Sequence, residues 1–226
     1  MRVKVFHWLD KEFVALSCEG KTATTAGEEM REVLKRFDAA LRGLNLSLDD
    51  TVRTRLWARD KDSRRLASTE RLEVLSGKAR SSSSSFIAPQ HFDSDANVAL
   101  DLLAMRPSKA GAGKILKEYD PPVSPLRSLR YDDIVFLSGV TSALPTLSDQ
   151  VSDAIEHIRN SLTDAGSSWD RAVKVSFLLH RNRKLADLKE AFTNTVKVKI
   201  PQMEFSFVDG YAGERNLIEI EVTALG

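Results

Sequence analysis

Arg80 is the side chain of this sequence best placed to bind a small carboxylate. It stands between two small residues, Ala79 and Ser81, and follows the turn-forming Gly77. A guanidinium in such a setting offers two parallel N–H donors to a planar carboxylate, which the ammonium of a lysine does less well. The spacing by itself favours this role and that of an ordinary exposed arginine about equally.

Two glutamates near the C-terminus, Glu219 and Glu221, alternate with Ile218 and Ile220. One face of the predicted strand is therefore acidic and the other apolar. Two interpretations are open. Both glutamates are solvated on an edge strand, or one of them orients or deprotonates a water molecule, which requires hydrogen-bond reach and a suitable pKa.

A run of five serines, Ser81–Ser85, follows Arg80 directly. Such a run is typical of a solvated low-complexity loop. However, the apolar residues Phe86, Ile87 and Ala88 come immediately afterwards. They favour a strand whose hydroxyl and amide groups face a carboxylate ligand beside the arginine.

Other possible motifs are weaker. The glycine-rich segment 111–114 lacks the first glycine and the hydroxyl residue of a phosphate-binding loop, because Ser108 and Ile115 stand there, so a flexible linker is the better interpretation. Cys18 has no partner for an internal disulfide. Four histidines without metal-ligand spacing are interpreted as surface or packing residues: His7, His91, His157 and His180. No metal site is expected.

The elements that must position these residues occur twice, because the chain matches itself at an offset of 121 residues. The matching pairs include Ser17 with Ser138, Leu41 with Leu162, Asp49 with Asp170 and Val52 with Val173. A self-similar period of this kind indicates two copies of one domain. Positions at which the copies differ are then the first places to look for function.

In the first copy, residues 28–41 are predicted to form a helix with Thr24 or Thr25 as its N-cap. Its apolar stripe consists of Met30, Val33, Leu34, Phe37 and Leu41. Residues 51–58 alternate as a strand. A weaker helix over 63–76, a strand after Arg80 and a closing strand through residues 98–102 complete the copy.

The second copy repeats this order with a strand at 135–138, a helical stripe from 151 to 162, a strand at 173–177, a helix at 185–196 and a closing strand at 218–222. Each copy is therefore expected to run β, α, β, α, β, β, an α+β arrangement with antiparallel or mixed pairing. The predicted domains are residues 1–105 and 128–226. The linker between them, 106–127, is rich in proline and glycine and contains a candidate edge strand at 115–119.

Composition excludes several classes of protein. The net charge of +1 gives no overall field that would attract nucleic acid or an anionic membrane. No apolar run approaches the ~20 residues that span a bilayer. The N-terminus has no apolar signal core, and the single cysteine fits a reducing compartment, so a cytoplasmic location is expected.

Several segments of the second copy, taken in order, match one known family. They are 134–139 (IVFLSG), 162–170 (LTDAGSSWD), 173–175 (VKV), Pro201 and 218–222 (IEIEV). Together they resemble the Rid family, the reactive intermediate deaminases that are also called YjgF or L-PSP endoribonuclease-like proteins. The first copy is similar but more divergent, and keeps Ser17, 52–53 (VR) and 79–81 (ARS).

The resemblance implies two tandem Rid-like (chorismate mutase-like) domains, each a sheet with two helices packed on one face. It also implies a trimer with ligand clefts between domains, and no metal or organic cofactor. The implied activity is hydrolysis of small carboxylated enamines and imines, which gives keto acids and ammonia.

The family's site residues are divided between the copies. The family arginine falls on Arg80 in the first copy and on Met203 in the second, whereas the family glutamate falls on Glu219 in the second and on Ala99 in the first. The resemblance therefore implies Glu219 as the catalytic residue. The implied substrate-binding residues are Arg80, Ser81, Ser17, Ser138 and Gly139.

Neither copy keeps both key residues, so two arrangements are open: Arg80 and Glu219 meet in a composite cleft, or the sites serve another purpose. We therefore consider two functions. One is a Rid-like deaminase, with the family substrate or another small one. The other is a non-catalytic ligand-binding or structural protein with degenerate sites. The expected partner is a small carboxylate or imine, with no nucleic acid and no membrane, and the expected assembly is a homotrimer.

Overall fold

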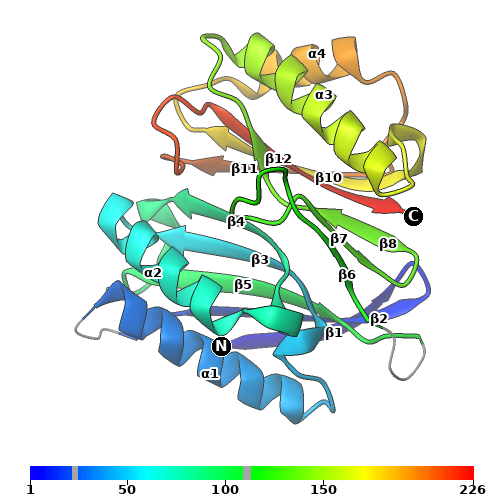
Figure 1. Ribbon diagram of the computed structural model, residues 1–226. Helices are drawn as coiled ribbons and strands as arrows, with labels where there is room; N and C mark the ends of the chain where they lie inside the picture. Colours follow the sequence, from blue (N-terminus) through cyan, green and yellow to red (C-terminus); the bar gives the residue numbers. More distant parts are fainter. Residues whose placement is uncertain (22–24, 109–112) are drawn as a thin grey trace. The chain divides into compact units, whose positions relative to one another are not determined.

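The computed structural model describes residues 1–21, 25–108 and 113–226. Thr24 and residues 111–112, named above as a possible cap and as part of the glycine-rich segment, lie outside these ranges. The chain divides into two compact units, Met1–Lys114 and Ile115–Gly226. Each unit is a mixed β-sheet with two α-helices. Figure 1 shows the sheets and helices along the chain. The predicted α+β fold class is confirmed.

The first unit has a five-stranded sheet in the order β1-β2-β5-β3-β4. Strands β3 and β4 are parallel, and the other neighbouring pairs are antiparallel. Helices α1 and α2 cover one face of this sheet (Figure 1). The elements are β1 (Arg2–Trp8), β2 (Lys11–Glu19), α1 (Ala26–Arg42), the 3-10 turn η1 (Leu48–Asp50), β3 (Thr51–Ala58), α2 (Lys61–Val74), η2 (Gly77–Ala79), β4 (Ser82–Ile87), η3 (Pro89–His91) and β5 (Val98–Met105).

The second unit repeats this plan, since the path β2-β5-β3-β4 recurs as β8-β12-β10-β11. The parallel pair is now β10 with β11. Helices α3 and α4 cover one face (Figure 1). The elements are β6 (Ile115–Lys117), β7 (Ser128–Tyr131), β8 (Ile134–Leu137), β9 (Val140–Thr141), α3 (Leu147–Asp164), η4 (Trp169–Arg171), β10 (Ala172–His180), α4 (Leu185–Thr195), β11 (Gln202–Val208) and β12 (Ile218–Leu225). No helix within the described ranges is long and apolar enough to cross a membrane.

The predicted element order was wrong at the start of each copy, where a hairpin stands in place of a single strand. The first unit begins with β1 paired to β2, and the second pairs β7 with β8. Leu9 and Asp10 form the first turn with positive φ angles of 52° and 57°. This conformation normally favours Asn-Gly or Asp-Gly. Because Leu9-Asp10 is neither of these pairs, the hairpin could not be predicted from its turn residues. The candidate edge strand at 115–119, inside the predicted linker 106–127, is confirmed, because Ile115–Lys117 form β6.

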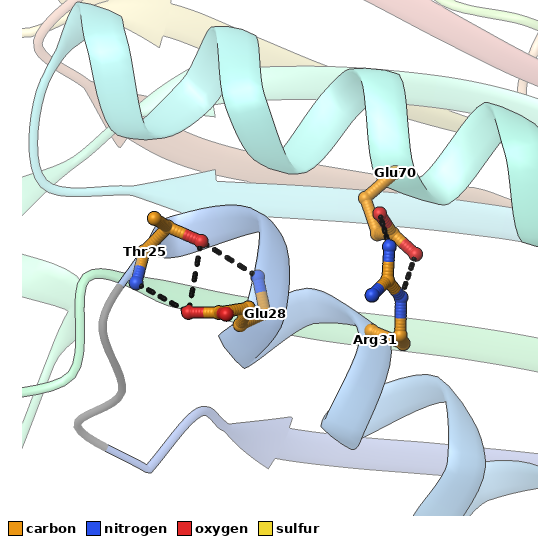
Figure 2. A network of polar contacts seen from close by, with 4 residues as sticks. All are labelled: Thr25, Glu28, Arg31 and Glu70. Carbon is orange, nitrogen blue, oxygen red and sulfur yellow. Dashed lines mark hydrogen bonds and ion pairs between the residues drawn. The ribbon is translucent and has the colours of Figure 1, made fainter.

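The first helix of each unit follows the predicted apolar stripe. In α1 the stripe residues Met30, Val33, Leu34, Phe37 and Leu41 are all fully buried. Thr25 is the N-cap: its hydroxyl accepts from the backbone N–H of Glu28 at 3.2 Å, and its own N–H donates to the Glu28 carboxylate at 2.9 Å (Figure 2). Figure 2 also shows Arg31 of α1 bound to Glu70 of α2 through Nε at 2.6 Å. This pair joins the two helices.

A buried polar side chain anchors the closing strand in each unit. On α1 the fully buried Glu29 accepts from Asn97 N at 2.9 Å, from Asn97 Nδ2 at 2.6 Å and from Val98 N at 3.3 Å. On α3 the fully buried Gln150 accepts from Leu217 N at 2.7 Å. Glu29 and Gln150 are separated by 121 residues, the period of the repeat. The two copies have therefore kept this anchor while changing its charge.

Candidate functional site

Glu219 lies on β12, a strand inside the second sheet. It is paired with Leu178 of β10 on one side and Thr141 of β9 on the other. As a residue it is only 6% exposed, and Glu221 is 1% exposed. The interpretation of these glutamates as solvated edge residues is therefore wrong. The apolar neighbours Ile218 and Ile220 belong to the core beneath the helices, so Glu219 points to the opposite face of the sheet.

Gly139 leaves room for the Glu219 carboxylate. A Cβ added to Gly139 would lie 1.7 Å from Glu219 Oε1 and 2.4 Å from its Cδ. Any other residue at position 139 would therefore displace this carboxylate. Ser138, the preceding residue, is 1% exposed. The structure thus brings together three of the predicted site residues: Ser138, Gly139 and Glu219.

Two tyrosines, neither predicted from the sequence, lie close enough to Glu219 for its charge to raise their pKa: Tyr211 and Tyr119. The hydroxyl of Tyr211 donates to the carbonyl of Leu178, the cross-strand partner of Glu219, at 2.7 Å. Burial raises the pKa of Tyr211, and the nearby Glu219 raises it further. Burial also raises the pKa of Tyr119, with Arg127 opposing and Glu219 adding to the shift. Both phenols therefore stay protonated and can act as hydrogen-bond donors at neutral pH.

A second carboxylate, Glu204 on β11, stands on the same sheet face. Ser176 of β10 is paired with both Glu204 and Glu221, which places the three side chains in one row across the sheet. The Ser176 hydroxyl donates to Glu204 Oε2 at 2.8 Å, and Lys174 Nζ lies 3.1 Å from the same oxygen. This face of the second sheet is therefore rich in carboxylates.

In the first unit, Arg80 follows η2 and precedes the first paired residue of β4. Its residue is partly buried, and the neighbouring Ser81 is 8% exposed. The predicted strand after Arg80 is confirmed, because Ser82–Ile87 form β4. Ser82 binds the carbonyl of Val52 through its hydroxyl at 2.8 Å. At least this serine stabilises the parallel strand pair.

Lys114 holds the backbone of Arg80. Its ammonium donates to the carbonyl of Arg80 and to that of Thr51, at 2.8 Å in both cases. Burial lowers the pKa of Lys114 to about 8, while Asp49 and Asp50 act in the opposite direction. The lysine at the end of the glycine-rich segment 111–114 thus binds two carbonyl oxygens of its own unit.

The lowered pKa of Lys114 predicts a pH effect on stability. In the unfolded chain a lysine titrates near 10.4. Between pH 8 and that value the unfolded chain binds more protons at this position than the folded one, so the free energy of unfolding gains a contribution as the pH rises. Relative to Lys114→Met, the wild type should gain about 1 to 3 kcal/mol between pH 7 and pH 10 once solvent screening is allowed for. Urea unfolding of both proteins at the two pH values measures this gain, and exposed Lys78→Met is the control. An unchanged difference would contradict the assignment.

The pairing of strands shows which residues of the two copies correspond. It corrects the residue matched to Arg80 and supports the residue matched to Glu219. Arg53 is paired with Ser82, and the matching Lys174 is paired with Gln202. Counting back two residues from each partner places Ile200, not Met203, at the position of Arg80. The sequence correspondence was wrong because it followed the proline motif rather than the strand pairing. In either case the second copy has no arginine there.

The other correspondence rests on the closing strands. Trp57 is paired with Ala99, and the matching Leu178 is paired with Glu219. Ala99 therefore occupies the Glu219 position in the first unit, as predicted. Its partner on the other side is Glu19. The first unit thus has a carboxylate one strand away from the position used in the second.

An aromatic and acidic cluster surrounds Ala99. The Trp57 indole N–H donates to Asp101 at 2.7 Å, and the His91 ring stacks on the indole with centroids 4.3 Å apart. Burial lowers the pKa of His91, although Asp101, Glu19 and another nearby carboxylate act against this. Burial acts to raise the pKa of Glu19, but hydrogen bonds from residues 93 and 94 lower it overall. Spacing along the sequence does not reveal this cluster, because its members come from four separate segments.

Ser17 of β2 lies beside this cluster, opposite Asp101, which in turn is opposite Arg55 of β3. Ser17, Arg80 and Ser81 belong to the first unit, whereas Ser138, Gly139 and Glu219 belong to the second. The composite cleft joining Arg80 to Glu219 therefore stays a prediction. Among the described residues no group of three or more histidine, cysteine, aspartate or glutamate side chains is arranged to hold a metal ion.

Comparisons with known proteins give a likeness of fold. No family model and no curated protein matches the chain. A solved chorismatase structure aligns with 98% of this chain and 79% of its own, at 12% identity and a TM-score of 0.69. A YjgF/YER057c/UK114 family protein from Mycobacterium tuberculosis aligns with 50% of this chain and 100% of its own, at 19% identity and a TM-score of 0.46. A Rid family protein of unknown function from Yersinia pestis aligns with 50% and 100%, at 18% identity and a TM-score of 0.46.

Two units, each a mixed sheet with two helices, form the tandem α+β arrangement that the sequence predicted. The chorismatase shares this fold over nearly the whole chain. At these identities the likeness concerns the fold, and the chemistry has to be argued from the residues themselves.

Proposed function

We propose that this protein hydrolyses small carboxylated imines or enamines to keto acids and ammonia. The observation that carries the proposal is the buried Glu219 carboxylate, which lies directly against the Gly139 backbone beside Ser138. A carboxylate so placed on a rigid central strand is suited to orient a water molecule and take its proton.

The proposed reaction has a simple balance. Water adds to the imine carbon while Glu219 accepts the water proton. This proton passes to the nitrogen, which gives a carbinolamine. The nitrogen then takes the proton of the new hydroxyl, the carbon–nitrogen bond breaks, and ammonia leaves as the carbonyl forms. An enamine first takes a proton on carbon to become the imine. Arg80 binds the substrate carboxylate, as its guanidinium geometry allows. Tyr211 supports the site through the hydrogen bond that its hydroxyl donates to the carbonyl of Leu178, the cross-strand partner of Glu219.

The test is an assay in which an amino-acid oxidase generates the imine and its disappearance is followed with and without the protein. Wild type should accelerate the loss of the imine relative to buffer. Arg80→Ala should raise KM by about 10- to 100-fold, because a charge-assisted pair to a carboxylate contributes about 1.5 to 3 kcal/mol. Lys78→Ala, an exposed cation two residues away, should leave KM unchanged.

The same proteins distinguish the non-catalytic alternative. If imine loss is no faster than in buffer, the deaminase proposal fails. Thermal stabilisation by 2-oxo acids that disappears in Arg80→Ala, without turnover, would then identify a carboxylate-binding protein.

A second candidate activity is hydrolysis of the enol ether of chorismate. It is favoured by the fold likeness to a chorismatase over 98% of this chain. Chorismate carries two carboxylates and an enol ether, and enol ether hydrolysis, like that of an enamine, needs carbon protonation followed by addition of water. Incubation of the protein with chorismate and measurement of released pyruvate tests this activity, with Glu219→Gln as the control.

A further inference from the structure

We propose that Lys114 is a positioning residue for Arg80, which fixes the direction in which the arginine side chain leaves the backbone. This inference deepens the proposed function and rests on its assignment of Arg80 as the carboxylate anchor. Nothing in the Rid resemblance assigns a role to this lysine.

A short 3-10 turn, η2, leads into Arg80. The residue follows a single 3-10 turn whose N-cap, Ser76, makes no side-chain capping bond. The turn begins at Gly77 with φ of +54°. The backbone N–H of Arg80 reaches the carbonyl of Gly77 at 3.4 Å, which is a long hydrogen bond. The turn itself therefore contributes a long hydrogen bond to the backbone of Arg80.

Lys114 adds a tertiary contact to this backbone. Because Arg80 precedes Ser82, the first paired residue of β4, the ladder with β3 does not begin until after it. Lys114 Nζ binds the Arg80 carbonyl and, with a second N–H, the carbonyl of Thr51 at the start of β3. Lys114 therefore connects the first residue of β3 to the residue that lies two positions before β4.

This contact acts on the side chain through the backbone. A fixed carbonyl fixes ψ of Arg80, which is 139°, and hence the orientation of its peptide planes and its Cα–Cβ bond. A guanidinium that must meet a carboxylate with two parallel hydrogen bonds tolerates little error in its starting direction. The lysine reaches this position from 34 residues further along the chain, so the anchor is tertiary rather than local.

The first measurement follows Arg80 itself. The Nε–H signal of Arg80 in a proton–nitrogen NMR spectrum is assigned by its loss in Arg80→Lys. Lys114→Met should shift or broaden this signal, Lys114→Arg should preserve it, and exposed Lys78→Met should leave it unchanged. If Lys114→Met is not folded, Lys114→Gln takes its place, because its shorter side chain cannot reach both carbonyls. An unaltered Arg80 signal in the folded variant overturns the inference.

The second measurement is kinetic. Lys114→Met should raise KM for a carboxylated imine about tenfold while kcat stays within about a factor of two, since the chemical step does not involve the lysine. In an Arg80→Ala background the same substitution should leave KM unchanged. An equal rise in both backgrounds would show that the lysine acts without Arg80, which overturns the inference. If wild type has no activity but Lys114→Met moves the Arg80 signal, the proposed function fails and the positioning role stands.

Discussion

Glu219→Gln is expected to lower kcat/KM for imine hydrolysis by about 10² to 10⁴, the range contributed by a positioned general base. The amide has nearly the shape of the carboxylate and keeps the packing against Gly139. It cannot accept a proton from water at neutral pH. Steady-state kinetics with the oxidase-generated imine measure the loss, and circular dichroism checks the fold. Glu190→Gln, at an exposed position of α4, should behave as wild type.

Gly139→Ala tests the same carboxylate by displacement. The new methyl group would stand 1.7 Å from Glu219 Oε1, so the side chain must move away. Activity should fall to a similar extent although the carboxylate is still present. Gly113→Ala is a matched control, because no atom of the described chain lies within 4 Å of a Cβ there. Full activity in Gly139→Ala would contradict the assignment of Glu219 as the base.

Glu29→Ala is expected to cost about 3 to 5 kcal/mol of unfolding free energy, since each buried donor left unsatisfied costs about 1 to 3 kcal/mol. The alanine would leave the donors Asn97 N, Asn97 Nδ2 and Val98 N without their carboxylate. A typical protein is stable by about 5 to 15 kcal/mol, so much of the stability would be lost.

Urea unfolding measures this cost. Glu32→Ala, on the exposed side of the same helix, should change the free energy of unfolding by about 0.5 kcal/mol or less. Equal effects of the two substitutions would show that the buried carboxylate is not an anchor. Glu29→Gln should lie between them, because one oxygen acceptor remains.

The helices and most strands could be predicted from the sequence because their signal is periodic. The stripe on α1 from Met30 to Leu41 and the alternation around Glu219 both repeat at the spacing of a buried face. The same alternation in the two closing strands identified Ala99 as the residue of the first copy that corresponds to Glu219, and the strand pairing agrees. The hairpin turn at Leu9 has no such signal, since its positive φ occurs in a residue that rarely adopts it.

The site could be predicted only in part. Glu219 and Ser138-Gly139 were found because short segments carry them, and their proximity is now visible in one unit. Tyr211 and Tyr119 were missed because tertiary packing, not spacing, brings them near the glutamate. The contact of Lys114 with Arg80 was missed for the same reason.

The position of the closing strand also governs how each unit can fold. In the first unit β5 lies between β2 and β3, and in the second β12 lies between β8 and β10. Before the closing strand pairs, the strands on its two sides are not hydrogen-bonded to each other, so the sheet exists only as two separate parts. Contacts of such long sequence separation slow folding. Each unit is therefore expected to assemble in a single late step, so that a fragment ending before its closing strand should gain little stable structure.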